Sequence, residues 1–175
     1  MRLFLSIVAV SFFGQAYSQD KDIDNFVRKV ENLRREAKLT VKVYPDKAFE
    51  GSVTGYYVKD SLVLIATLTD AETGGRETLY YIREGQLRKV YIMTAKFDSN
   101  NEWAEYHTKH KSMDNCHSCH LKPNCMLTVV TFAADTTVEG TRLGQARTVT
   151  EKERASILSY TTKKSQELKT LLKEL

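Results

Sequence analysis

Successive runs of β-branched and aromatic residues fill the middle of the chain and constrain its fold more than any other feature. Most of the runs end at a turn signal: Pro45, the segment Lys59-Asp60-Ser61, "TGG" at 73–75, or Gly85, which is able to adopt positive φ. Short strands at this spacing predict an antiparallel meander. The expected strands lie in "LTVKVYP", in the two halves of "SVTGYYVKDSLVLIATLTD", and in "RETLYYI", "QLRKVYIMTAKF" and "CMLTVVTFAAD", with one or two more in "TVEGTRLGQARTV".

An amphipathic stretch precedes the strands. Its apolar residues recur at spacings of three and four and form one stripe, which predicts a helix. Asp22 or Asp24 is expected to cap this helix, and its end is expected near Lys38. The stripe consists of Ile23, Phe26, Val27, Val30, Leu33 and Ala37.

A second amphipathic stretch follows the strands. Thr150 and Glu153 match a capping box, in which each side chain bonds the other residue's backbone N–H. The sequence therefore predicts an α+β fold with an N-terminal helix, an antiparallel β-meander and a C-terminal helix, and both helices are expected on one face of the sheet. The apolar stripe of the second helix consists of Ile157, Leu158, Thr161, Leu168, Leu171, Leu172 and Leu175.

The first residues predict export. An apolar run of h-region length follows Arg2, and "AYS" at 16–18 supplies small residues where a signal peptidase cleaves. We expect a signal peptide over 1–18 and a single mature α+β domain over 19–175. The expected location is periplasmic or secreted, without stable membrane insertion once the signal is cleaved.

Charge and motif content exclude several classes. The formal net charge is +4, and the two densest basic patches, "VRKVENLRREAK" and "KKSQELKTLLKEL", both interleave acidic residues. This pattern is typical of solvated helix faces, so no nucleic-acid partner is expected. The G-x-S-x-G, H-E-x-x-H and P-loop patterns are absent, so no catalytic residue is assigned and enzymatic activity stays open. The tyrosine pairs of the strands are interpreted as cross-strand packing.

All three cysteines and all four histidines lie within 107–125. Cys116, Cys119 and His120 form a C-x-x-C-H, which resembles the attachment motif of c-type haem. The resemblance implies that the two cysteines carry thioether bonds to the porphyrin and that His120 is an axial ligand of the iron. The candidates for the other axial position are His107, His110, Met113 and Met126.

The same residues allow two other interpretations. His107, His110, Cys116 and Cys119 offer two imidazoles and two thiolates, a donor set that suits tetrahedral zinc and also copper. Alternatively, Cys125 forms a disulfide with one of the two upstream cysteines, as is common in exported proteins. The C-x-x-C pair is also a candidate redox pair.

The strand pairs "GYYVKDSLVLIATL" and "RETLYYIREGQLRKVYI", together with the C-terminal helix, resemble small exported proteins of Bacteroidetes-type bacteria. The resemblance covers roughly 40–97 and 150–175 and implies no established activity. The segment 98–125 has no counterpart in that pattern, which indicates a Cys/His-rich insertion into a sheet. The leading hypothesis is an exported protein with one covalent haem that transfers electrons to a redox partner protein or senses a redox state or a small gas. The alternative is a non-enzymatic binding or structural domain whose loop holds zinc, copper or a disulfide.

Overall fold

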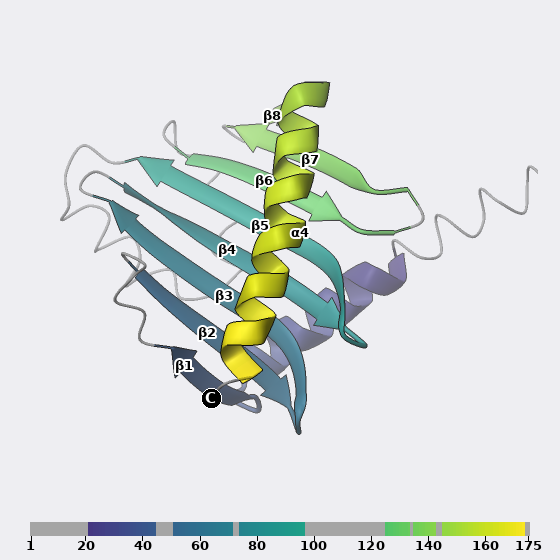
Figure 1. Ribbon diagram of the computed structural model, residues 1–175. Coiled ribbons are helices and arrows are strands. Elements are labelled where there is room, and N and C mark those ends of the chain that lie inside the picture. Colours follow the sequence, from purple (N-terminus) through teal and green to yellow (C-terminus); the bar gives the residue numbers. More distant parts are fainter. Residues whose placement is uncertain are drawn as a thin grey trace, which may run out of the picture.

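The computed structural model describes residues 21–44, 51–71, 74–96, 125–133, 135–142 and 145–173. These residues form a helix over 21–35, eight antiparallel strands and a long C-terminal helix, α4 (Glu151–Lys173), so the predicted α+β meander is confirmed (Figure 1). The strands pair in chain order, β1-β2-β3-β4-β5-β6-β7-β8. They are β1 (Thr40–Tyr44), β2 (Gly51–Val58), β3 (Ser61–Ala71), β4 (Gly74–Arg83), β5 (Gln86–Lys96), β6 (Cys125–Thr131), β7 (Thr137–Arg142) and β8 (Gln145–Arg147).

The two helices pack on opposite faces of the sheet, so the prediction that both lie on one face is wrong (Figure 1). The helix 21–35 contributes Val27 and Val30 to one core cluster, and α4 contributes Leu168 and Leu172 to a separate one. The sheet residues of the first cluster are Leu64, Ala66, Leu79, Tyr81 and Met93, and those of the second are Val53, Ile65, Tyr80, Ile82, Val90 and Val130. The described residues therefore form three layers: helix, sheet, helix.

The central strands explain why both faces are covered. "LVLIA" at 62–66 and "LYYI" at 79–82 are continuous apolar runs, and the neighbours Tyr80 and Tyr81 are both fully buried. A strand with one wet face alternates apolar and polar residues, whereas a strand buried on both faces reads as an unbroken apolar run. Successive side chains point to opposite faces, so one helix alone is unable to cover both tyrosines.

The N-terminal helix ends in a Schellman motif. The Lys38 backbone N–H donates to the Leu33 carbonyl at 2.9 Å, and the Ala37 N–H donates to the Arg34 carbonyl at 3.1 Å. Ala37 has φ of 53°, in the left-handed region that this motif requires at its C′ position. Ala37 is also exposed, so the prediction that it belongs to the apolar stripe is wrong.

Asp22 and Asp24 do not cap the N-terminal helix, because the helix runs through both positions. Their carboxylates accept hydrogen bonds from the sheet instead: Asp22 from Arg83, and Asp24 from Lys89. These two residues therefore join the helix to β4 and β5.

The capping box at the start of α4 is confirmed. The Thr150 N–H donates to Glu153 Oε2 at 2.9 Å, and the Glu153 N–H donates to Thr150 Oγ1 at 3.3 Å. The Glu153 carboxylate accepts hydrogen bonds from the Thr150 backbone N–H, from the Thr150 hydroxyl and from Arg147, and these bonds lower the pKa of the carboxyl. In the described part of the chain, no helix combines the length and the apolar character that a membrane span requires.

Candidate functional site

The site residues predicted from the sequence belong to the connection between β5 and β6. The segment 97–124 lies outside the described residues and contains Cys116, Cys119, His120, His107, His110 and Met113. Of the predicted group, only Cys125 and Met126 lie in a described element, where they begin β6. The haem, zinc and disulfide interpretations of this segment therefore stay predictions.

The two ends of this connection are fixed by neighbouring strands. β5 and β6 pair antiparallel, with Ala95 opposite Cys125. The chain therefore leaves β5 and enters β6 at adjacent points on one end of the sheet. A loop of two residues suffices to join two such strands, so the segment 97–124 is far longer than the strand pairing needs.

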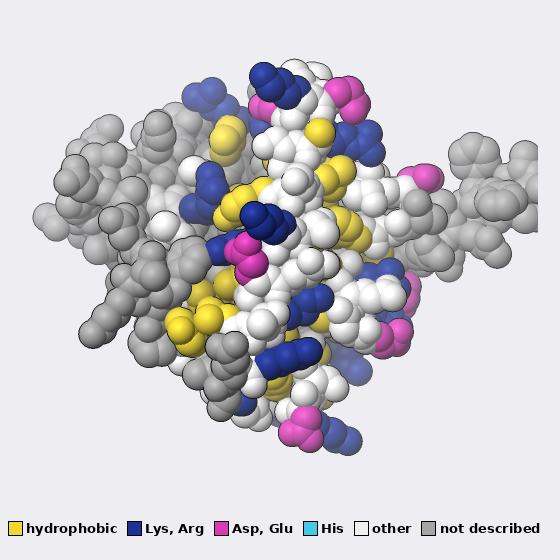
Figure 2. Space-filling model, viewed as in Figure 1, with side chains coloured by type: hydrophobic (Ala, Val, Ile, Leu, Met, Phe, Trp, Pro, Cys, Tyr) yellow, Lys and Arg dark blue, Asp and Glu magenta, His cyan; other side chains and the backbone are white. Residues whose placement is uncertain are grey.

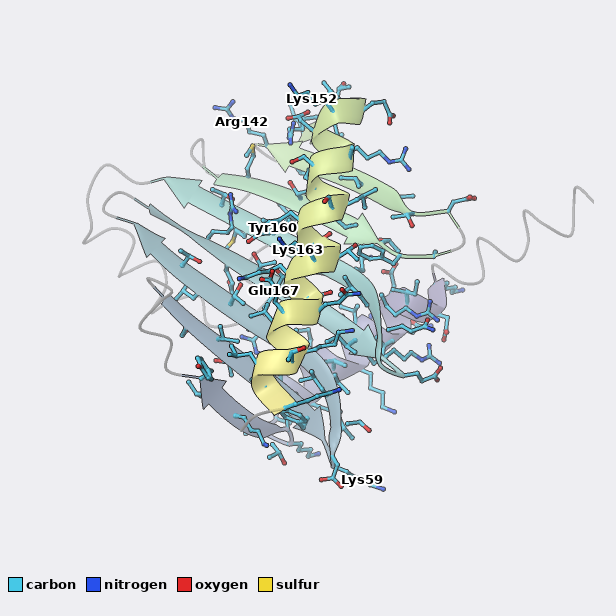
Figure 3. The ribbon with its side chains drawn as sticks, viewed as in Figure 1. Lys59, Arg142, Lys152, Tyr160, Lys163 and Glu167 are labelled. Atoms are coloured by element: carbon cyan, nitrogen blue, oxygen red, sulfur yellow. The ribbon has the colours of Figure 1, made fainter. Side chains whose placement is uncertain are left out.

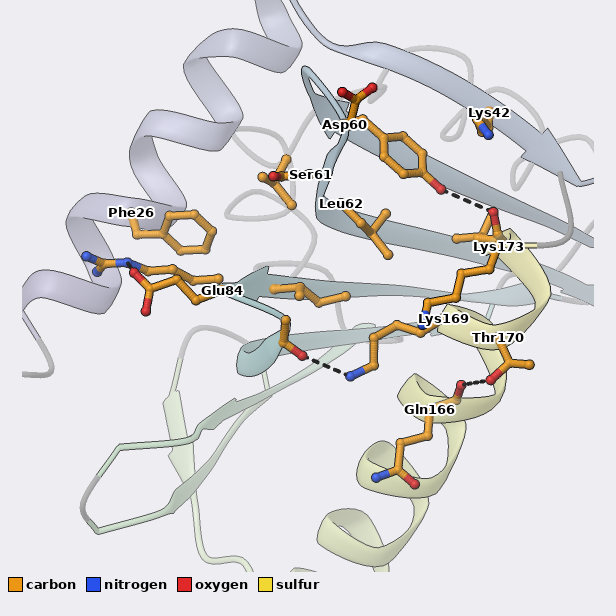
Figure 4. A pocket seen from close by; sticks show the side chains of 16 residues that line it. Phe26, Lys42, Asp60, Ser61, Leu62, Glu84, Gln166, Lys169, Thr170 and Lys173 are labelled. Carbon is orange, nitrogen blue, oxygen red and sulfur yellow. Dashed lines mark hydrogen bonds and ion pairs between the residues drawn. The ribbon is translucent and has the colours of Figure 1, made fainter.

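A groove lies at the other end of the strands, between α4 and the tips of the β2–β3 and β4–β5 hairpins (Figure 4). Its volume is about 740 Å³, within the range of roughly 300–1,000 Å³ that is usual for small-molecule sites. β5 has 11 residues, so at roughly 3.3 Å per residue this groove lies roughly 30 Å from the start of the Cys/His connection. Its apolar lining consists of Phe26, Leu62, Val63, Ile82 and Leu172.

Two irregularities in the sheet lie at the groove. The β2–β3 register shifts so that Tyr57 pairs with Leu62 and Val63 has no partner. The β4–β5 register shifts in the same way beside Ile82, which pairs with Leu87. Such bulges bend a strand and increase its twist, and they are frequent beside binding sites. Both bulges bend the hairpins whose tips form the groove.

The groove is basic on the side of α4. The lining includes Lys42, Lys169 and Lys173 there, and it also includes the carboxylate of Asp60 (Figure 4). Lys169 donates to the Gly85 carbonyl at 3.1 Å. Lys42 lies over the Tyr57 ring, with its Nζ 5.6 Å from the ring centroid.

Opposite α4, the charges of the groove are already paired. Arg83 contacts Asp22 and also Glu84, with 3.8 Å between Arg83 Nε and Glu84 Oε1. Its guanidinium also lies over the Phe26 ring, 5.9 Å from the centroid. The net positive charge of the groove is therefore concentrated at the three lysines.

Tyr57 is the groove's phenol. Its hydroxyl donates to the Leu172 carbonyl in the last turn of α4 at 3.4 Å, and partial burial raises its pKa. A phenol with a raised pKa stays neutral at physiological pH. In the described lining, three lysines, the Arg83–Glu84 ion pair and this neutral phenol lie beside apolar side chains, an arrangement suited to binding.

A buried polar cluster lies beneath the N-terminal helix. The Tyr81 hydroxyl donates to Glu31 Oε1 at 2.7 Å, and Arg34 Nη1 lies 3.7 Å from the same oxygen. Burial, followed by the neighbouring charge of Glu31, raises the pKa of Tyr81 well above its usual range. Sequence analysis placed Glu31 among the solvated charges. Its spacing of four from Val27 is the signal that would have placed it on the buried side.

Sequence analysis also missed the groove, because Lys169 and Lys173 have the spacing of an ordinary solvated helix face. Among the described residues, no group of three or more histidine, cysteine, aspartate or glutamate side chains is placed to hold a metal ion. The described residues define the class of protein: a three-layer α+β meander with a groove at one end of its sheet and the Cys/His connection leaving the other. No family model, curated protein or solved structure matches the chain.

Proposed function

We propose that this protein is exported and carries one covalent c-type haem, which serves electron transfer or the sensing of a redox state or a small gas. The observation that carries the proposal is the C-x-x-C-H of Cys116, Cys119 and His120. Two thiols at this spacing suit the two vinyl groups of one porphyrin, and the adjacent imidazole suits one axial position of the iron. The expected location is periplasmic or secreted, and the expected partner is a redox protein.

The sheet supports this proposal by offering a fixed base for the attachment segment. The antiparallel pairing of β5 and β6 fixes the strand ends on both sides of 97–124, so a group bound there would be tethered to the sheet at two adjacent points. His107, His110 and Met113 are candidates for the second axial position. A histidine there gives a low reduction potential and a methionine a higher one.

A second candidate function rests on the cysteine and histidine side chains that one covalent haem does not require. Cys125 has no role in attaching one haem, and His107 and His110 repeat the spacing of Cys116 and Cys119. These features favour a zinc or copper site, or a disulfide that closes the loop, in a non-enzymatic binding or structural domain.

The deciding experiment is expression with export and with haem-maturation genes present. The purified protein is expected to show a Soret band and to be heavier by the mass of one haem, because each S–H adds across a vinyl bond without a leaving group. Cys116→Ser with Cys119→Ser should abolish the colour, whereas Cys125→Ser, the matched control, should keep it. A colourless protein of unmodified mass would overturn the haem proposal. Bound zinc with three free thiols would then select the metal site, and one free thiol the disulfide.

Deleting the segment tests whether haem attachment is separate from folding. Replacing 97–123 with Asn-Gly continues the β5–β6 register and closes it with a turn that suits a two-residue hairpin. We expect this variant to keep the circular dichroism of the sheet and to lose the haem. Loss of the sheet signal would show that the segment belongs to the core.

A further inference from the structure

We infer that the groove at the hairpin end of the sheet binds a single-chain carboxylate amphiphile, that is, a free fatty acid. The inference is independent of the haem proposal, because this groove lies at the hairpin end of the strands, whereas β5 ends and β6 begins at the other end. It rests on the shape of the groove, its apolar lining and the position of its charges.

The apolar part of the groove suits an aliphatic chain. In Figure 4, Phe26 lies at one side, Leu62 lies in the middle, and the α4 residues lie at the other side. The partly exposed apolar side chains of the lining are Phe26, Leu62 and Val63, and Ile82 and Leu172, each 1% exposed, lie behind them. α4 leaves part of this sheet face uncovered, since hydrophobic side chains are visible on both sides of it in Figure 2. Burial of a hydrocarbon chain on such a lining is favourable in proportion to the area removed from water.

The charged part suits an anionic head group. Lys42, Lys169 and Lys173 line the groove on the α4 side, and the one other cation among its described lining residues, Arg83, lies on the far side with its two carboxylate partners. Three ammonium groups next to an apolar lining match a molecule with a hydrocarbon chain and one carboxylate. This charge complementarity orients the chain toward Phe26 and the carboxylate toward α4.

The lysines also have a role without any ligand. Lys169 and Lys173 lie in the last turns of α4, where cations favour the negative end of the helix dipole. Their aliphatic stems also cover apolar surface while the ammonium groups stay in water. These roles predict an effect on helix stability and none on ligand binding, so a binding experiment separates the two explanations.

The test uses calorimetric titration of the purified protein with dodecanoate below its micelle concentration. Dodecyltrimethylammonium is the control probe, with the same chain and the opposite charge. Dodecanoate is expected to bind, with amide shift changes at Leu62, Ile82 and Leu172, and the cationic probe is expected to bind at least roughly tenfold more weakly.

A pair of variants tests the role of the lysines. Lys169→Gln with Lys173→Gln should weaken dodecanoate binding by roughly fivefold or more, the effect of partly exposed charges. The matched control, Lys152→Gln with Lys163→Gln, removes two exposed lysines of the same helix that do not line the groove (Figure 3), and its affinity should be unchanged.

Three outcomes would overturn the inference. The first is no dodecanoate binding in the millimolar range, and the second is equal binding of the two probes or of the two lysine variants. The third is binding to anionic vesicles without binding of monomeric dodecanoate, which would identify a membrane surface as the target. None of these outcomes bears on the haem proposal, which is tested by colour and mass.

Discussion

The two faces of the sheet hold their helices by different chemistry. On the face of helix 21–35, the contacts are directional and charged. Tyr81 donates to the buried Glu31, Lys89 donates to Asp24, and the Arg34 guanidinium lies over the Tyr56 ring, 5.1 Å from its centroid. Each of these contacts requires one particular partner at one particular position.

On the face of α4, the contacts with the core are mainly apolar. Leu168 and Leu172 are each 1% exposed. The buried polar residues of α4 bond to their own helix: Thr161 Oγ1 donates to the Ile157 carbonyl at 2.8 Å, and Ser165 Oγ donates to the Thr162 carbonyl at 2.9 Å. These hydroxyls are therefore satisfied without any partner in the sheet.

The contrast teaches that one sheet can hold two helices in two ways. Hydrophobic burial is strong but non-directional, whereas a buried hydrogen bond costs free energy when either partner is lost. The face of α4 should therefore respond most to lost methylene groups, and the face of helix 21–35 should respond to the loss of a single hydroxyl.

The largest expected effect is on the apolar face. Leu168→Ala removes a side chain that is fully enclosed and should lower the free energy of unfolding by about 2–5 kcal/mol. Leu171→Ala is the matched control, because Leu171 is only partly buried on the same helix. Urea denaturation should show a clearly smaller loss for the control. Equal losses would mean that α4 does not pack through Leu168.

The next largest effect on stability is expected when the hydroxyls of two adjacent tyrosines on opposite faces are removed in turn. Tyr81→Phe leaves the Glu31 carboxylate without its buried donor and should cost about 1–3 kcal/mol. Tyr80→Phe removes a buried hydroxyl that makes no close hydrogen bond among the described residues and interacts with the Tyr160 hydroxyl of α4 only weakly, so stability should change less than in Tyr81→Phe. Both changes remove one oxygen from a fully buried ring. Denaturation midpoints that shift equally would contradict the contrast between the faces.

Alkaline pH should weaken both faces together. Burial raises the pKa of both Tyr80 and Tyr81 above the usual value of 10.0. Below that pH the tyrosines are protonated whether the chain is folded or unfolded, so their ionisation does not change the free energy of unfolding with pH. As pH rises further, the unfolded tyrosines lose protons that the buried ones keep, so the free energy of unfolding falls by on the order of 1 kcal/mol per pH unit for each tyrosine.

Melting temperatures between pH 8 and pH 11 test this dependence. Either Tyr→Phe variant should show a shallower alkaline decrease than the unmodified protein. A decrease of the same slope in both variants and in the unmodified protein would assign the alkaline loss to other groups.

The smallest effect lies at the end of helix 21–35. Ala37→Gly should raise the free energy of unfolding by about 0.5–1 kcal/mol, because Ala37 has positive φ and glycine adopts this conformation without strain. Ala155→Gly, the same change at an exposed position inside α4, should lower stability by a similar amount. In thermal denaturation, the melting temperature should rise for Ala37→Gly and fall for Ala155→Gly. Destabilisation by both would contradict the Schellman end.

Features that depend on nearby residues were predictable from the sequence. The capping box of Thr150 and Glu153 and the turn at Gly85, with φ of 74°, both formed as expected. The C-x-x-C-H motif is equally local, so it was readable from spacing alone, although its function stays a prediction. Ala37 was misassigned because a helix stripe and a left-handed C′ position are both compatible with an apolar residue at that spacing.

Features that depend on distant residues were not predictable in this way. Glu31 is recognisable as buried only once Tyr81, 50 residues further along the chain, lies against it. The groove lysines acquire a common environment only where α4 meets Lys42 of β1 and the two hairpin tips. Spacing within one element carries no information about which distant element will face it.

The sequence by itself determined the first six strands and at least one more after them, the two amphipathic helices and the helix cap of α4, because turns, caps and periodicity act over a few residues. It left open whether the last stretch forms one strand or the two, β7 and β8, that the structure has. Only the tertiary structure decided that the helices lie on opposite faces. Tyr80 and Tyr81 point in opposite directions from one strand, and each is buried by a different helix. The helices lie on opposite faces because burying the apolar side chains on both faces of the central strands is favourable. The same arrangement leaves the groove open beside the end of α4.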